Sequence, residues 1–191
     1  MPQPSSLFLP VAAALCLLLS SCICSVNPIS SPQTAKPDLA LVGNWTDNTR
    51  PVAGTGRIFV THSPWMRAVS FDAKGRELKG SGDIINFFPS TLGKDAFLNV
   101  LDVETTPHGP VKSYLFYRYQ VSDGHVLRIW AIADKPVLKA VRSGKLKGTI
   151  TPGDHDSVLI QDSSENIQAF IIRSHPHKLF NGAPITILYK R

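Results

Sequence analysis

Two arginines and three aromatic residues lie in adjacent apolar stretches, and they are the residues best suited to hold a ligand. Arg118 lies within the stretch 114–121 (YLFYRYQV), and Arg128 lies within 126–132 (VLRIWAI). An arginine among apolar neighbours either packs against a ring or binds an anionic group. The candidate ligand-binding residues are therefore Arg118, Arg128, Tyr117, Tyr119 and Trp130.

The other polar residues form no recognisable catalytic or metal-binding pattern. His175-Pro-His177 and Asp154-His155-Asp156 have metal-ligand residue types, but both fall in predicted loops, where solvated histidines are the simpler interpretation. No nucleophile-elbow pattern occurs, and the carboxylates are scattered rather than paired as a glycosidase requires. We predict no catalytic residue, no metal and no cofactor, and keep a hydrolase only as an alternative.

The dipeptide Asp123-Gly124 predicts the β-hairpin that positions the candidate residues, because a type I′ turn favours this pair. With a two-residue turn, Tyr117 would face Trp130 and Tyr119 would face Arg128. The rings would then share one face, which would be the better candidate for a barrel interior, and Arg118 would point to the other. A longer turn would re-pair every residue, so the interior face stays open.

The remainder of the chain predicts a mainly β fold. Short apolar runs separated by turns recur from residue 39 onward, which is typical of an antiparallel eight- or nine-stranded barrel or a strongly curved sheet. Two short helices are expected near the C-terminus. One begins near Asp134 and carries Pro136 in its first turn, and the other follows Asp162-x-x-Glu165, a capping-box pattern.

Composition narrows the class of protein. A chain of 191 residues with 43% hydrophobic content fits one globular domain. The formal net charge of +6 comes from Lys and Arg spread along the chain, without the basic stripe that a nucleic-acid surface requires. We therefore expect no nucleic-acid partner.

The N-terminus predicts a targeting segment. Residues 1–22 contain no charged side chain, and the apolar run Leu7–Leu19 has the length of a signal-peptide core rather than of a membrane span. Leu19-Ser20-Ser21-Cys22 resembles the lipobox of bacterial lipoproteins, although the n-region lacks Lys and Arg and Pro10 interrupts the run. The resemblance implies lipidation of Cys22 and, with Ile23 rather than Asp next, an outer-membrane lipoprotein facing the periplasm. An ordinary secretory signal or an uncleaved anchor are the alternatives.

These patterns divide the chain into three parts. Residues 1–21 are the expected signal peptide, the Ser/Pro-rich residues 22–38 a flexible membrane tether, and residues 39–191 a single β-barrel domain. Lipidation of Cys22 would leave Cys24 as the free thiol.

Two further resemblances concern the domain. Gly43-x-Trp45 at its start is similar to the beginning of lipocalins and calycins, in which the Trp packs across the barrel base. The succession YLFYRYQ, VLRIWAI, GKLKG and DSSENIQAF, within residues 95–191, resembles small bacterial lipoproteins of uncharacterised function. The expected function is a non-catalytic envelope lipoprotein that contacts another envelope protein or the cell wall. The alternative is a lipocalin-like barrel that binds a small apolar or anionic ligand.

Overall fold

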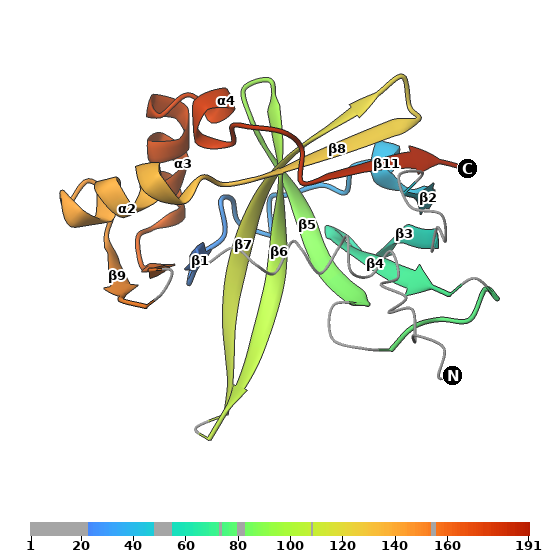
Figure 1. The fold of residues 1–191 in the computed structure, drawn as a ribbon, viewed down its shortest axis with the longest axis horizontal. Coiled ribbons are helices and arrows are strands. Elements are labelled where there is room, and N and C mark those ends of the chain that lie inside the picture. The colour runs from blue at the N-terminus through green and yellow to red at the C-terminus, as the bar shows by residue number, and fades with distance from the viewer. Residues whose placement is uncertain (1–22, 48–54, 73, 80–82, 108, 154–155) are drawn as a thin grey trace, which may run out of the picture.

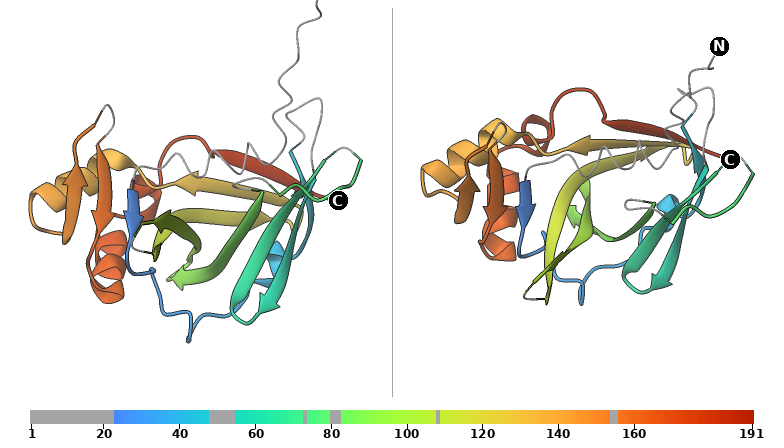
Figure 2. Two further views of the ribbon diagram at one scale, coloured as in Figure 1. Left: turned by 90° about the horizontal axis from the view of Figure 1, so that it is seen from below. Right: turned by 60° about the horizontal axis from the view of Figure 1, so that its bottom comes forward.

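The computed structural model describes residues 23–47, 55–72, 74–79, 83–107, 109–153 and 156–191. The predicted signal peptide, Cys22, Gly80-Ser81-Gly82 and the pair Asp154-His155 lie outside these residues. The fold has two parts, a β-barrel and a layer of strands and helices against one side of it (Figures 1 and 2).

Eight antiparallel strands form a closed barrel, as the sequence predicted. Going around the barrel, the order is β6-β5-β4-β3-β2-β11-β8-β7, and β7 pairs with β6 to complete the circle. Strands β2 to β8 are neighbours in chain order, so this part of the chain forms a meander. The strands are β2 (Gly43–Thr46), β3 (Thr55–His62), β4 (Trp65–Phe71), β5 (Ile84–Leu92), β6 (Asp95–Thr106), β7 (Gly109–Ser122), β8 (Val126–Ala131) and β11 (Thr186–Lys190).

Side chains fill the barrel interior. Alternate residues of each strand point inward and make one cluster with Leu41 and Trp45. Trp45 is 1% exposed, and its indole Nε1–H donates to Leu41 O at 2.7 Å, so the ring is held at the barrel end. The interior retains an apolar cavity of about 30 Å³, lined by Leu, Ile, Val, Ala and Phe side chains. That volume is the scale of one water molecule, and a fatty acid does not fit it.

The β7–β8 hairpin forms at the predicted turn but in a different register. Asp123 (φ 51°) and Gly124 (φ 69°) both have the positive φ of a type I′ turn. His125 is one extra residue in the returning strand, so Ser122 pairs with Val126. The prediction that Tyr117 faces Trp130 and Tyr119 faces Arg128 was therefore wrong.

The extra residue changes which side chains share a face. Arg118 pairs with Trp130, and Tyr119 pairs with Ile129. Tyr117 and Tyr119 face the barrel interior, whereas Trp130 belongs to the cluster outside the barrel. One inserted residue has this effect because side chains alternate between faces with a period of two.

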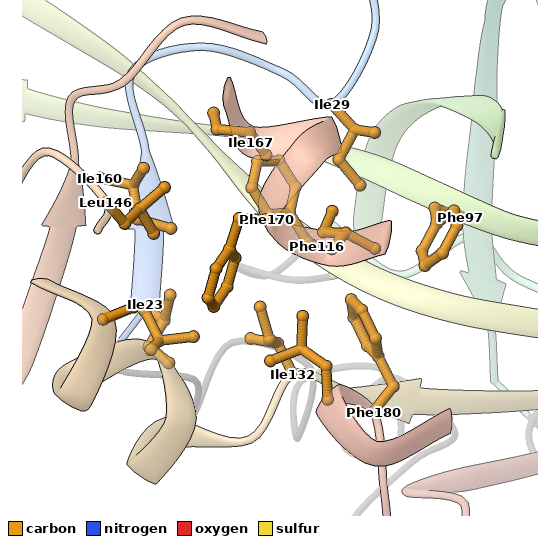
Figure 3. Packing of buried hydrophobic residues seen from close by; sticks show 14 of the residues in the cluster. Ile23, Ile29, Phe97, Phe116, Ile132, Leu146, Ile160, Ile167, Phe170 and Phe180 are labelled. Atoms are coloured by element: carbon orange, nitrogen blue, oxygen red, sulfur yellow. The ribbon is translucent and has the colours of Figure 1, made fainter. Parts of the chain in front are cut away.

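A second hydrophobic cluster lies between the barrel and the outer layer (Figure 3). Phe97, Phe116, Trp130 and Ile132 cover the outer face of β6, β7 and β8, and helices and short strands pack over them. The layer consists of β1 (Ile23–Ser25), β9 (Gly148–Thr151), β10 (Ser157–Ile160), α2 (Asp134–Arg142), α3 (Ser164–Arg173) and α4 (Pro176–Leu179).

The helices begin close to the predicted caps. α2 starts at Asp134, and Pro136 lies in its first turn. α3 is capped by Ser163, whose hydroxyl accepts from Asn166 N–H, rather than by the expected Asp162. Asp162 instead accepts from Lys147 N–H at 2.8 Å and ties the helix start to the residue that precedes β9. Among the described residues, no helix has the length and apolar character needed to cross a bilayer.

The segment that the sequence predicted as a flexible tether is packed against the domain. β1 pairs in parallel with β10 and, through Ser25 and Tyr114, with β7. Ile23 is 2% exposed and Ile29 is fully buried in the second cluster. The proline and serine residues of this segment give the backbone an irregular path across the barrel. The apolar residues between them are buried, which those of an unstructured linker are not. The ordered part of the chain therefore begins before residue 39.

Candidate functional site

Arg118 is the one lysine or arginine that is buried among the described residues. The residue is 8% exposed and lies on the outer face of β7, between Phe97 of β6 and Trp130 of β8. Its guanidinium carbon is 4.1 Å from the centroid of the Trp130 ring. This cation–π stacking fixes the plane of the guanidinium and compensates part of the lost hydration.

Two side chains from distant parts of the chain reach the guanidinium. Arg118 Nη1–H donates to His177 Nδ1 at 3.0 Å, and Arg118 Nη1 is 3.6 Å from Asp95 Oδ1. His177 Nε2 is 3.3 Å from the same carboxylate oxygen. Since an arginine can only donate, Nδ1 must carry a lone pair, so the imidazole is neutral in this arrangement.

Local structure explains how these partners reach the site. Gly93, with φ 62°, reverses the chain between β5 and β6, and Asp95 is the first residue of β6. His175 adopts φ 57° just before Pro176 starts α4, and this change of direction brings His177 over β7. Figure 1 shows α4 beside the loop that joins β5 to β6.

The Arg118 cluster opens on a polar groove of about 440 Å³. Lys94, Tyr119 and Gln120 line it together with Arg118, Asp95 and His177. A second groove of about 480 Å³, with Ser30, Thr34 and Ser90 in its wall, shares Asp38, Ala96 and Tyr119 with the first. The two grooves therefore meet at Asp38 and Tyr119.

A partly buried hydrogen bond stabilises the junction of the grooves. Tyr119 Oη–H donates to Asp38 Oδ2 at 2.7 Å, and Asp38 Oδ1 accepts from Ala40 N–H at 2.9 Å, capping the 3₁₀ helix η2 (Leu39–Leu41). Burial raises the pKa of the Tyr119 hydroxyl above its ordinary value, and the bond to the Asp38 carboxylate raises it further. Tyr119 therefore acts as a hydrogen-bond donor at neutral pH.

The structure brings together only some of the candidate residues. Arg118 and Trp130 are in contact, and Tyr119 lines the same groove. Arg128 lies apart, donating to Ser122 Oγ at 2.9 Å. Tyr117 is fully buried inside the barrel, where its hydroxyl has no hydrogen-bond partner among the described residues and burial raises its pKa.

Sequence reasoning missed Asp38, Asp95 and His177 as parts of one site. His177 was noted for its metal-ligand residue type, and Asp95 as a scattered carboxylate. No local pattern links residues 38, 95, 118 and 177, because only the closed barrel and the outer layer bring them together. Within the described residues, no group of three or more His, Cys, Asp or Glu side chains could hold a metal ion.

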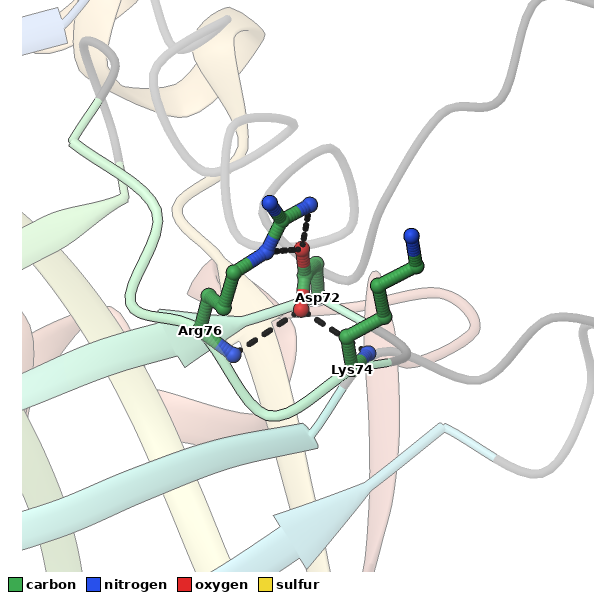
Figure 4. A network of polar contacts seen from close by, with 3 residues as sticks. All are labelled: Asp72, Lys74 and Arg76. Carbon is green, nitrogen blue, oxygen red and sulfur yellow. Dashed lines mark hydrogen bonds and ion pairs between the residues drawn. The ribbon is translucent and has the colours of Figure 1, made fainter.

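A second polar cluster, at the end of β4, is a turn (Figure 4). Asp72 Oδ1 accepts from Lys74 N–H at 2.8 Å and Arg76 N–H at 2.9 Å, and Oδ2 is 2.8 Å from Arg76 Nη2. The backbone hydrogen bond from Arg76 lowers the pKa of Asp72. The cluster stabilises the turn that follows β4 and lines none of the grooves described above.

Comparisons with known proteins found no matching family model, no matching curated protein and no matching solved structure.

Proposed function

We propose that this protein is a non-catalytic lipoprotein of a bacterial cell envelope, held in a membrane by an acyl chain on Cys22. The observation that carries the proposal is the apolar run Leu7–Leu19 followed directly by Leu19-Ser20-Ser21-Cys22. The uncharged run is too short for a confident membrane span but suits a signal-peptide core. Ile23 after the cysteine favours the outer membrane, with the domain facing the periplasm.

The packing of the N-terminal segment supports a specific form of this proposal. Ile23 is buried and paired with Val158 of β10, one residue after Cys22. An acyl chain on Cys22 would therefore hold the domain close to the bilayer, with no free spacer between anchor and fold. Contact with other envelope components would then take place near the membrane surface.

The filled barrel interior argues against the alternative of a lipocalin-like carrier. Barrels of this size either pack their interior or enclose one ligand, and the cavity of about 30 Å³ belongs to the first kind. An apolar ligand would have to displace core side chains such as Leu98 and Leu127. We therefore do not propose an interior ligand site.

The test is metabolic labelling of the full chain with radioactive palmitate in a Gram-negative host. The wild type should incorporate label and sediment with membranes, and Cys22→Ala should lose both properties. Cys24→Ala is the matched control, two residues away, and should keep both. Labelling that survives Cys22→Ala, or that disappears in Cys24→Ala alone, would contradict the proposal.

A further inference from the structure

The buried guanidinium of Arg118 has unused hydrogen-bonding capacity. An arginine has five N–H donors, and the contacts with described residues include one hydrogen bond, to His177. The 3.6 Å separation from Asp95 is too long for a hydrogen bond. Nε is buried and has no hydrogen-bond partner among the residues that the structure describes. A charge that has left water is normally satisfied by several acceptors, so this site lacks an acceptor.

We propose that Arg118 anchors a binding site for a small oxyanion, a carboxylate or phosphate group, in the groove beside α4. The guanidinium presents a planar fork that matches such groups, and stacking on Trp130 holds that fork in place. The groove of about 440 Å³ has room for a small ligand that carries the anion. This site is independent of the proposed lipid anchor.

His177 occupies the position of the anion when the site is empty. Its neutral ring accepts the Nη1–H bond at 3.0 Å, yet its side chain is 61% exposed. An exposed ring on the four-residue helix α4 can rotate into water at small cost, whereas Arg118 cannot leave the cluster. An anionic oxygen is a stronger acceptor than a neutral imidazole nitrogen, so it would replace the ring.

The surrounding charges set the expected strength of binding. Lys94 at the groove rim favours an anion, whereas the carboxylates of Asp95 and Asp38 oppose it. Asp38 is already engaged by Tyr119 and Ala40, which leaves Asp95 as the main opposing charge. We therefore expect weak binding of a simple anion, and Asp95→Asn should strengthen it.

The experiment is isothermal titration calorimetry of the purified full-length chain with inorganic phosphate, acetate and the short-chain lipid dihexanoyl phosphatidic acid. Arg118→Met, which keeps an apolar chain on Trp130, should weaken binding by at least about tenfold because it removes the charge-assisted hydrogen bonds. Arg118→Lys keeps the charge without the fork and should weaken it less. Arg128→Met, on the neighbouring strand, is the matched control and should bind like the wild type.

The variants also test the role of His177. His177→Ala should bind the anion a few-fold more tightly, because the ring no longer competes. Binding of inorganic phosphate would identify the ligand as a free anion, whereas binding of the lipid alone would identify it as a lipid headgroup. Either result supports an anion site at Arg118. The proposal would be overturned if the wild type bound no probe at tens of millimolar, or if both folded Arg118 variants bound as tightly as the wild type. Weaker binding by His177→Ala than by the wild type would also overturn it. Thermal unfolding of each variant confirms that it is folded.

Discussion

Replacing Ile29 with alanine tests whether residues 23–38 belong to the folded domain. Ile29 is fully buried in the second cluster, and its N–H donates to Asn99 Oδ1 at 2.7 Å. The substitution removes three buried carbons, a transfer loss of about 2.4 kcal/mol at ~0.8 kcal/mol for each. The remaining cavity raises the cost, and such substitutions typically span about 2–5 kcal/mol.

Urea unfolding of the wild type and the variant measures this loss. With a slope of about 2 kcal/mol per molar urea, a loss of about 3 kcal/mol lowers the midpoint by about 1.5 M. Ile172→Ala is the matched control, because Ile172 is 56% exposed, and a surface substitution should change stability by no more than about 0.5 kcal/mol. If Ile29→Ala lowers the free energy of unfolding no more than Ile172→Ala does, residues 23–38 are not packed against the domain and the reasoning is refuted. In the wild type, the Ile29 amide should exchange its hydrogen slowly, because it is buried and donates to Asn99.

Two further predictions concern buried polar groups. Asn99→Ala should destabilise the fold by about 2–4 kcal/mol, because it leaves Ile29 N–H and Ser90 Oγ without the buried amide that pairs with them. A double-mutant cycle with Ser90→Ala, measured by urea unfolding, checks the hydrogen bond from Asn99 Nδ2–H to Ser90 Oγ, and additive losses would contradict it. Burial raises the pKa of the Tyr119 hydroxyl above the ordinary value of 10.0, so its contribution to stability is full below pH 10 and falls as the pH rises further. The free energy of unfolding of Tyr119→Phe should therefore fall less between pH 9 and pH 11 than that of the wild type. If urea unfolding shows the same pH dependence for both proteins, the tyrosine is not buried and protonated as described.

The sequence predicted the β7–β8 hairpin and helices α2 and α3 because the responsible signals are local. The aromatic and β-branched runs on either side of Asp123-Gly124 predicted a hairpin, and Pro136 in a first turn predicted α2. The hairpin register was not predictable in the same way. The bulge at His125 depends on longer-range pairing, including Lys190 N–H donating to His125 O at 2.8 Å.

The tether shows a second limit of local reasoning. The Ser/Pro-rich composition without periodicity predicted a flexible linker over residues 23–38. It carries no information on the few apolar residues in that segment, and Ile23 and Ile29 are buried only because β10, α3 and the outer face of the barrel offer matching surfaces. Whether an irregular segment is docked depends on contacts with residues far along the chain.

By itself, the sequence predicted a mainly β fold, a barrel or a strongly curved sheet, with short helices near its C-terminus. It also proposed Arg118, Arg128, Tyr117, Tyr119 and Trp130 as ligand-binding residues. The tertiary structure alone decided that the barrel interior is filled and that Arg118 lies outside it. It also placed Asp95 and His177, 23 residues before and 59 after Arg118, beside one guanidinium. The physical reason is that alternation and turn propensity act over a few residues. Which face becomes the interior depends instead on the register of the closed sheet, where one extra residue reverses every side chain that follows.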